Sequence, residues 1–244
     1  MNKIYLGDCL VVMDELISQG VKVDAIITDP PYGTTACKWD SVIPFDEMWK
    51  RLNQLIKPNG AIVLFGSEPF SSLLRVSNLK NYKYDWVWDK KGTGGFLNAK
   101  IRPLKRHENI LVFSNGKPVY YPIKEVRGKE RNKGGYNKKK GDGDMVYGKF
   151  KNLESFNNEY YPTDIIEISN AVNKGKVHPT QKPVALIEYL IKTYTNENEL
   201  ILDFTIGSGT SAIAALNTNR RYTGIEKDEN YYNITLERIN EHNL

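Results

Sequence analysis

Long apolar runs and cysteines are scarce in this chain. Its 244 residues contain no apolar run near the ~18 residues that a membrane-spanning helix requires, so we expect no membrane span. The opening residues Met1-Asn2-Lys3 lead straight into strand-like sequence, without the apolar stretch of a secretion signal. The two cysteines, Cys9 and Cys37, lack the spacing of a metal site. These absences predict a cytoplasmic protein with reduced thiols and no metal.

Acidic residues are outnumbered in the middle of the chain. The segment 117–151 contains 11 Lys or Arg residues and 4 Asp or Glu residues, a charge of +7, while the whole chain carries +5. The remainder is therefore close to neutral, at about −2. A basic segment beside a near-neutral core indicates a polyanionic partner such as nucleic acid. The alternative is a solvated loop that contributes only to solubility.

Strand-like apolar runs alternate with segments of helical spacing, and this alternation predicts an α/β fold with a mixed, mostly parallel sheet covered on both faces. A Gly- and Lys-rich loop is expected over 90–106, and the irregular pattern after residue 114 suggests an inserted lobe. The chain then divides into 1–114, 115–173 and 174–244. We expect strands at 3–6, 23–28, 61–65, 86–88, 110–113, 200–204 and 222–226, and helices at 10–18, 44–56, from a cap at Ser67, 183–194, 211–217 and from Tyr231.

One tetrapeptide directly follows an apolar run. Asp29-Pro30-Pro31-Tyr32 comes after the expected strand 23–28 and forms a rigid lip rich in hydrogen-bond acceptors. Asp29 and the Pro30 carbonyl can accept both hydrogens of a planar amino group, and Pro31 has no N–H to compete. A nucleobase amine held in this way localises its lone pair, while Tyr32 stacks on the base. A base inside a duplex must leave the helix to reach this lip. The alternative is a tight turn capped by the aspartate.

A glycine-rich turn follows another apolar run near the end of the chain. Residues 200–204 lead into Gly207-Ser208-Gly209, where glycines allow a ligand to approach the backbone closely. Glu226 ends the next expected strand, and an acid at that place can accept the hydroxyls of an adenosyl ribose. The chain lacks the third glycine of a dinucleotide site and the Gly-Lys-Ser/Thr of a phosphate loop, which disfavours NAD binding and ATP hydrolysis. The alternative is a turn without a ligand.

The order of several motifs makes the chain similar to a known family. Asp29 to Tyr32 comes first, the basic segment follows, and then come His178-Pro179-Thr180-Gln181-Lys182-Pro183 and the turn from Asp203 to Thr210. In this order the chain resembles the β class of S-adenosylmethionine-dependent DNA amino-methyltransferases. Gly7-Asp8-Cys9 and Arg106-His107-Glu108 also match family segments. In the glycine motif this chain has Phe204-Thr205-Ile206, where the family often has Pro or Phe followed by Phe.

The resemblance implies a three-layer, Rossmann-like methyltransferase fold with a circularly permuted motif order. The segment 1–114 would be the catalytic half of the core, 115–173 the target-recognition insertion and 174–244 the cofactor-binding half. The implied cofactor is S-adenosylmethionine, and the implied partner is double-stranded DNA, with a homodimer allowed. We expect the catalytic residues to be Asp29, Pro30, Pro31 and Tyr32, the cofactor residues to be Asp8, Thr180, Lys182, Asp203, Phe204, Gly207, Ser208, Gly209, Thr210 and Glu226, and the DNA contacts to include Arg127, Arg131, Lys138, Lys139 and Lys140.

The aspartate in the tetrapeptide is similar to that of the adenine-N6 enzymes, whereas those acting on cytosine N4 more often have serine there. We therefore expect methyl transfer to adenine N6, with cytosine N4 as the nearest alternative. Two further alternatives are a non-catalytic DNA-binding protein that keeps a cofactor pocket, and a methyltransferase acting on RNA or protein.

Five other positions admit simpler interpretations. Lys182 is either a ligand of the cofactor carboxylate or a surface cation before a helix. Cys37 is interpreted as an incidental thiol, because cytosine-C5 enzymes have a Pro-Cys pattern and neither cysteine here follows a proline. His107 is expected to pack or to donate a hydrogen bond, since the product amine is acidic enough to lose its proton to water. Trp86 and Trp88 share one strand face and are expected in the core.

Overall fold

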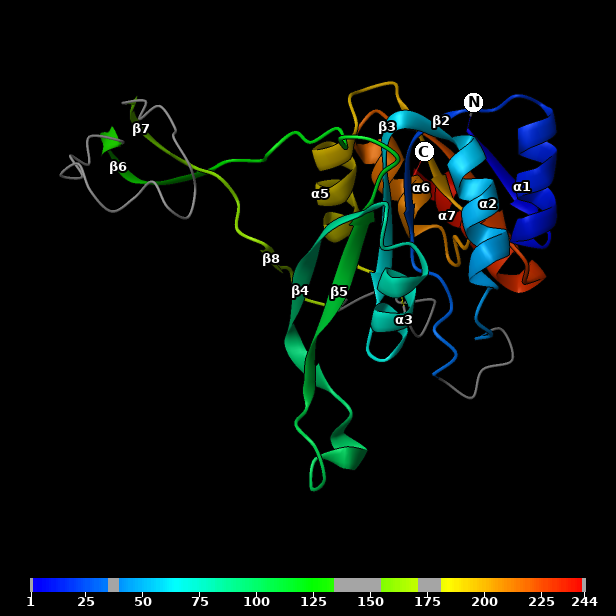
Figure 1. The fold of residues 1–244 in the computed structure, drawn as a ribbon, viewed down its shortest axis with the longest axis horizontal. Coiled ribbons are helices and arrows are strands. Elements are labelled where there is room, and N and C mark those ends of the chain that lie inside the picture. Colours follow the sequence, from blue (N-terminus) through cyan, green and yellow to red (C-terminus); the bar gives the residue numbers. More distant parts are fainter. Residues whose placement is uncertain (1, 35–39, 134–154, 171–180, 243–244) are drawn as a thin grey trace. The chain divides into compact units, whose positions relative to one another are not determined.

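The computed structural model describes residues 2–34, 40–133, 155–170 and 181–242 (Figure 1). The chain divides into two compact units. The larger unit comprises Met1–Tyr121 and Asp164–Leu244, and the smaller unit comprises Pro122–Thr163. Within the described residues, no helix combines the length and apolar character that crossing a bilayer requires.

A sheet of eight strands forms the centre of the larger unit. Strand β5 is antiparallel to both of its neighbours, and the other pairings in this sheet are parallel. This confirms the expected mixed, mostly parallel α/β sheet. In spatial order the strands are β1 (Lys3–Leu6), β10 (Arg221–Glu226), β9 (Leu200–Asp203), β2 (Val23–Thr28), β3 (Ile56–Gly66), β5 (Lys105–Phe113), β4 (Tyr82–Gly94) and β8 (Ile165–Glu167).

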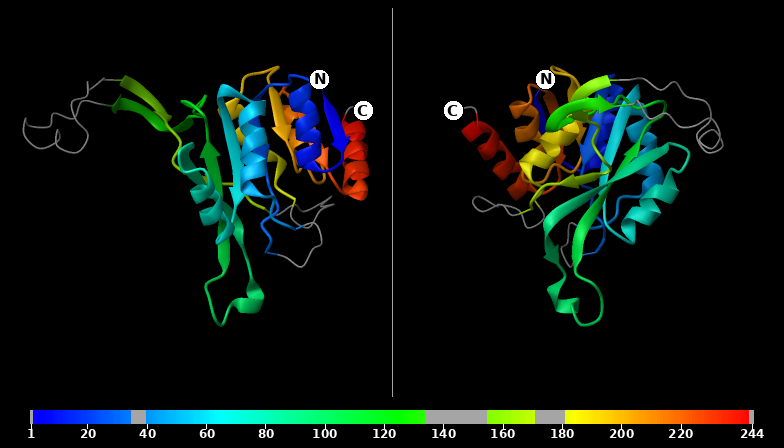
Figure 2. Two further views of the ribbon diagram at one scale, coloured as in Figure 1. Left: turned by 45° about the vertical axis from the view of Figure 1, so that its right-hand side comes forward. Right: turned by 90° about the vertical axis from the view of Figure 1, so that its left-hand side faces the viewer.

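Helices cover both faces of this sheet, so the unit has three layers (Figures 1 and 2). Successive strand residues face opposite sides. In β2, Ala25 and Ile27 pack into the core beneath one helical layer, while Ile26 packs beneath the other. One layer contains α1 (Cys9–Ser18), α2 (Phe45–Leu55) and α3 (Phe70–Ser77), and the other contains α5 (Val184–Tyr194), α6 (Thr210–Asn217) and α7 (Glu229–His242).

The ribbon formed by β4 and β5 is longer than the sequence predicts. The apolar runs indicate strands only at 86–88 and 110–113, but β4 continues to Gly94 and β5 begins at Lys105, so both ends of the expected loop at 90–106 are strand. Asp89 pairs with His107 and Gly94 pairs with Lys105. This part of the ribbon is mostly exposed, so it has no alternation of apolar side chains that would reveal a strand.

Other element boundaries also differ from expectation. Strand β3 begins at Ile56 rather than Ala61. The expected cap at Ser67 is wrong, because α3 begins at Phe70, with Pro69 at its N-cap and no side-chain cap. Ser67 contributes its backbone carbonyl, which accepts a hydrogen bond from the Ser71 N–H at 3.2 Å. The region expected to be irregular contains β8 and the antiparallel pair β6 (Glu125–Lys133) and β7 (Ser155–Tyr160) of the smaller unit.

The strand order brings two distant segments together. Strands β2 and β9 are neighbours, but the chain continues from β2 to β3 on one side and from β9 to β10 on the other. In α/β sheets of this kind, ligands bind at such a switch point, outside the carboxyl ends of the strands. The loops that leave β2 and β9 begin at Asp29 and Phe204, respectively. The topology therefore places the tetrapeptide beside the glycine turn.

Candidate active site

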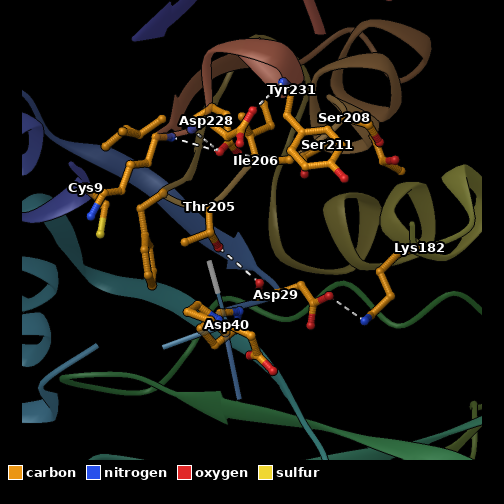
Figure 3. Close-up of a pocket in the computed structure, with 18 of the residues that line it drawn as sticks. Cys9, Asp29, Asp40, Lys182, Thr205, Ile206, Ser208, Ser211, Asp228 and Tyr231 are labelled. Carbon is orange, nitrogen blue, oxygen red and sulfur yellow. Dashed lines mark hydrogen bonds and ion pairs between the residues drawn. The ribbon is translucent and has the colours of Figure 1, made fainter. Parts of the chain in front are cut away.

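A cavity of about 610 Å³ lies at this switch point (Figure 3). Its volume is within the ~300–1,000 Å³ typical of cofactor sites. All four residues of the tetrapeptide line it, and so do seven of the residues expected to bind the cofactor, whereas Asp203 and Gly209 are not part of its wall. The seven are Asp8, Lys182, Phe204, Gly207, Ser208, Thr210 and Glu226.

Thr205 connects the two motifs directly. Its hydroxyl donates a hydrogen bond to the backbone carbonyl of Asp29 at 3.1 Å, as Figure 3 shows, and lies 2.7 Å from the hydroxyl of Thr28. Thr205 belongs to the part of the glycine motif in which this chain departs from the family pattern. The departure therefore supplies a hydroxyl that ties the end of β9 to the end of β2.

Asp203 stabilises the glycine turn from behind the cavity wall. Its carboxylate accepts hydrogen bonds from the Thr28 hydroxyl at 2.5 Å, the Thr205 N–H at 3.1 Å and the Ser211 hydroxyl. Burial raises the pKa of Asp203 to about 6, although these donors oppose the shift. Protein groups already occupy this carboxylate, so its contribution to a ligand site is to hold the loop in place.

The turn depends on two glycines with left-handed backbones. Gly207 has φ +58° and Gly209 has φ +82°, a region that other residues rarely adopt. A Cβ at Gly209 would lie 2.8 Å from the Thr235 side chain of α7. The Thr235 hydroxyl in turn donates to the Gly207 carbonyl at 2.8 Å. At Gly207 a Cβ would meet no atom within 4 Å, so the backbone there faces open space in the cavity.

Glu226 lies at the end of β10 and connects that strand to the glycine turn. Its half-buried carboxylate accepts hydrogen bonds from the N–H groups of Gly207 at 2.8 Å, Lys227 at 2.9 Å and Asp228 at 2.8 Å. Burial raises its pKa, and the N–H donors oppose this. Asp8 caps α1 by accepting from the Leu10 N–H at 3.0 Å. A glycine turn open to the cavity beside a fixed acid fits an adenosyl ligand.

On the other side of the cavity, Asp29 belongs to a chain of alternating charges. One oxygen of its carboxylate accepts from the Tyr32 hydroxyl at 2.5 Å, and the other accepts from the Lys182 ammonium at 2.5 Å. Lys182 also lies 3.2 Å from Glu108, which pairs with Lys90 at 3.2 Å. The Lys182 residue is only 9% exposed, so the interpretation of it as a surface cation is wrong.

The same contacts set the protonation of this cluster. Burial raises the pKa of Asp29, and the charge of Lys182 opposes that shift. Burial alone would lower the pKa of Lys182, but Asp29 and Glu108 outweigh it and raise that pKa. Burial alone would raise the pKa of Glu108, but Lys182 and Lys90 outweigh it and lower that pKa. Lys182 therefore stays charged between two carboxylates.

Several aromatic side chains and one thiol near the cavity are packed against other parts of the protein. The Tyr32 ring stacks on Phe70, with centroids 5.0 Å apart and an interplanar angle of 26°. Trp86 and Trp88 are 3% and 0% exposed, which confirms that they belong to the core. Burial raises the pKa of Cys9 to about 11, so its thiol is neutral at ordinary pH and is a poor nucleophile.

The sequence did not single out Glu108 and Asn170 as site residues. Both line the cavity; the buried Oε2 of Glu108 lies 3.2 Å from the Lys182 ammonium, and the Oδ1 of Asn170 is buried without a hydrogen-bond partner among the described residues. The position of Glu108, just before the apolar run 110–113, was the available signal, since it places the carboxylate at the end of a buried strand. No comparable signal marks Asn170.

Some expected residues cannot be placed. Thr180, Lys138, Lys139, Lys140 and Cys37 lie outside the described residues. His107 is exposed rather than packed.

Arg127 and Arg131 lie on β6 of the smaller unit. Together with Gly128, Lys129 and Tyr160 they line a shallow depression of about 340 Å³. The guanidinium carbons of Arg127 and Arg131 lie 5.5 and 5.4 Å from the centre of the Tyr160 ring. These cations are therefore gathered on one basic surface around an aromatic ring.

The fold and this cavity define a class of protein. A three-layer α/β unit with a glycine turn and an acid on one side of its switch point, and Asp-Pro-Pro-Tyr on the other, is the arrangement of an S-adenosylmethionine-dependent methyltransferase acting on an amino group. Comparison with known proteins narrows this class. The model of a DNA methylase family that includes N6 and N4 enzymes matches residues 23–237. The chain belongs to this family and is an S-adenosylmethionine-dependent DNA amino-methyltransferase.

Individual proteins similar to this chain are also DNA methyltransferases. The type II methyltransferase M1.MboII of Moraxella bovis is 30% identical, over 96% of this chain and 94% of that protein. The type II methyltransferase M.HpaI of Haemophilus parainfluenzae is 28% identical, over 89% of this chain and 68% of that protein. A crystal structure of M1.HpyAVI with S-adenosylmethionine has a TM-score of 0.70 and 28% identity, covering 98% of this chain and 100% of that one. The cytosine-N4-specific PvuII methyltransferase, at 16% identity, shares the fold with a TM-score of 0.66, over 99% of this chain and 90% of that one.

Proposed function

We propose that this chain transfers a methyl group from S-adenosylmethionine to N6 of an adenine that has left the DNA duplex. The single observation that carries the proposal is the shared cavity, in which the Asp29 carboxylate faces the same space as the turn at Gly207. The order of the motifs, with the tetrapeptide before the basic segment and the glycine turn, supports assignment to the β class.

Bound S-adenosylmethionine supplies an electrophilic methyl carbon on a positively charged sulfur. The Asp29 carboxylate and the Pro30 carbonyl accept the two amine hydrogens, which localises the nitrogen lone pair. Methyl transfer would form the N–C bond and leave the electrons of the broken C–S bond on sulfur, and Asp29 would stabilise the positive charge that grows on the nitrogen. The amine then loses a proton to water. Each Asp29 oxygen already accepts one hydrogen bond, and a carboxylate oxygen can accept a second.

Several cavity residues would hold the cofactor. Glu226 would accept from the ribose hydroxyls, because its carboxylate is fixed by N–H groups beside the open backbone of Gly207. Asp8 would contact the adenine ring, and Phe204, Ser208 and Thr210 would complete the wall. Asp203 and Gly209 would act indirectly by maintaining the turn.

Lys182 would act on the amine side of the cavity. In the described contacts its ammonium is bound to Asp29 and lies beside Glu108, so it favours the ionised form of Asp29 that accepts from the amine. The Tyr32 ring, which packs on Phe70 with one face, would stack on the extruded base with the other. Arg127 and Arg131 of the smaller unit would contact backbone phosphates, which position the protein on the duplex.

The nearest alternative is cytosine N4, which shares this mechanism. The aspartate of the tetrapeptide, which resembles that of the adenine-N6 enzymes, favours adenine over cytosine. The test is incubation with methyl-labelled S-adenosylmethionine and mixed-sequence duplex DNA, followed by digestion and identification of the labelled nucleoside. Label in N6-methyladenine supports the proposal, and label in N4-methylcytosine moves the target to cytosine. An absence of label in DNA, or preferential labelling of competing RNA or protein, would contradict it.

A further inference from the structure

Strands β4 and β5 continue beyond the edge of the sheet as an arm, which we define as residues 89–107. Strand β3 ends at Gly66, which pairs with Asn109, so within the described part of the chain β5 has no further strand partner on that side. Asp89 also pairs with β8, and the Lys90 carbonyl accepts a hydrogen bond from the Asn170 N–H at 3.0 Å. Beyond Lys90, the two strands of the arm pair only with each other among the described residues. Figures 1 and 2 show the arm projecting away from the α/β layers, with the short helix Phe96–Asn98 near its tip.

The arm begins at the rim of the cavity. Trp88 and Glu108 form the pair that immediately precedes it, and both residues line the cavity. From Trp88 to Gly94 the strand advances by up to ~20 Å, at ~3.3 Å per residue. A substrate whose reacting base reaches this part of the cavity would therefore lie beside the arm.

The tip of the arm is apolar and solvent-exposed. Phe96 is 78% exposed, Leu97 is 85% exposed and Ile101 is 81% exposed. Clustered exposed apolar side chains on a soluble protein mark an interaction surface more often than chance. The tip makes no ring contact or core contact among the described residues. Its apolar surface therefore needs a partner from outside this unit.

The charge of the arm indicates what kind of partner would bind there. Between residues 90 and 106 there are six Lys or Arg residues and no Asp or Glu. Lys91 and Arg106 pair with Glu167 and Asp89 at the base of the arm. Lys100 and Arg102, near the tip, form no ion pair among the described residues. An apolar tip between unpaired cations fits duplex DNA, whose phosphates are anionic and whose bases expose apolar faces when unstacked.

We propose that the arm enters the duplex beside the target base. Phe96, Leu97 and Ile101 cover the bases that lose a stacking partner when the target base leaves, and Lys100 and Arg102 contact the flanking phosphates. This inference rests on the proposed function, because it assumes that the target base is extruded into the cavity.

The first test compares Phe96→Ser/Leu97→Ser with the control Leu79→Ser. Leu79 is 64% exposed and lies before the other end of β4, away from the cavity. We expect the double variant to bind intact duplex about tenfold more weakly than wild type, since base stacking on apolar side chains contributes at this level. Its deficit should shrink on a duplex with mismatches, in which unstacking is already less costly. The control should bind both duplexes like wild type, and all three proteins should bind S-adenosylmethionine equally.

The second test compares Lys100→Gln/Arg102→Gln with Lys80→Gln. Lys80 is an exposed lysine at the opposite end of β4. The double variant should reduce the slope of log affinity against log salt by about one per cation removed, while the control should not.

Three results would overturn the inference. These are wild-type affinity in both double variants, an equal deficit on intact and mismatched duplexes, and loss of a dimer in the serine variant, which would make the tip a self-association surface. These binding experiments are independent of methyl transfer. If wild type transfers no label to DNA but the binding differences appear, the proposed function fails and the DNA contact of the arm stands.

Discussion

The two sides of the cavity neutralise their carboxylates differently. On the cofactor side, Glu226 accepts from backbone N–H groups and Asp203 accepts from hydroxyls and an N–H. On the amine side, Asp29 and Glu108 share the ammonium of Lys182. Backbone dipoles are fixed by the fold, whereas a lysine head group sits on a flexible stem and can shift. The cofactor side is thus pre-formed, and the amine side can adjust when a base arrives.

This difference predicts different kinetic consequences. Changes on the cofactor side should weaken binding of S-adenosylmethionine, while changes on the amine side should slow the chemical step. Four substitutions examine this contrast, from the largest expected effect to the smallest.

Asp29→Asn should have the largest effect. It removes the negative charge that stabilises the growing charge on the amine, so single-turnover methyl transfer should fall by about 10³-fold. The cofactor affinity, measured by calorimetry, should stay within about threefold, because Asp29 belongs to the amine side. A thermal unfolding curve controls for folding, since the near-isosteric asparagine leaves Lys182 paired with Glu108. If the variant transfers methyl groups at a rate within tenfold of wild type, the predicted role of Asp29 in the chemical step is contradicted.

Glu226→Gln should act on binding instead. Losing the charge-assisted hydrogen bonds to ribose should weaken S-adenosylmethionine binding by about 10- to 100-fold, as hydrogen bonds to charged groups contribute roughly 1.5–3 kcal/mol. The maximal rate at saturating cofactor should change little. Glu229→Gln, an exposed acid in the first turn of α7, is the matched control. A fall in maximal rate with unchanged cofactor affinity would show that Glu226 acts on the chemical step rather than on cofactor binding, which would contradict the prediction.

Lys182→Met should change the pH dependence of the rate. The charge of Lys182 opposes the burial that raises the pKa of Asp29, so removing it raises that pKa further. The ionised, active form of Asp29 is then lost at a higher pH as the solution is acidified, and the acidic limb of the rate profile moves upward. Lys182→Arg keeps the charge and should keep the limb near its wild-type position. Identical limbs in wild type and Lys182→Met would show that Lys182 does not control Asp29.

Asp203→Asn should affect stability more than activity. The pKa of Asp203 is about 6 in the folded state against an ordinary value of 3.8, so the folded state binds this proton more tightly. The contribution of Asp203 to the free energy of unfolding therefore decreases as pH rises through that window, by up to about 3 kcal/mol. The asparagine variant should lack this decrease, which urea unfolding at both ends of the window can measure. An unchanged pH dependence would remove Asp203 as its source.

The two sides also differ in how far the sequence predicts them. Asp29 to Tyr32, Gly207, Gly209 and Glu226 are recognisable because each follows an apolar strand run and has a residue type that its backbone or chemistry requires. The partners of Asp29 are not recognisable locally. Lys182 is 153 residues away from it in the chain, and only the adjacency of β2 and β9 and the packing of α5 bring them together.

The arm shows the same limit for the fold. The apolar alternation that predicts the central strands is absent where β4 and β5 leave the sheet, because solvent covers both faces of that ribbon. Backbone pairing between Gly94 and Lys105 continues without it. Periodicity therefore predicts the layered core and not the extension beside the cavity.

The central claim is that the amine-holding oxygens and the cofactor turn face one shared cavity. A crystal structure with a non-reactive analogue of S-adenosylmethionine tests it most directly. We predict the adenosyl group against Gly207 and Glu226, with the position of the transferable methyl directed at the Asp29 carboxylate and the Pro30 carbonyl. An analogue bound with that position directed away from Asp29, or bound outside the cavity, would contradict the account.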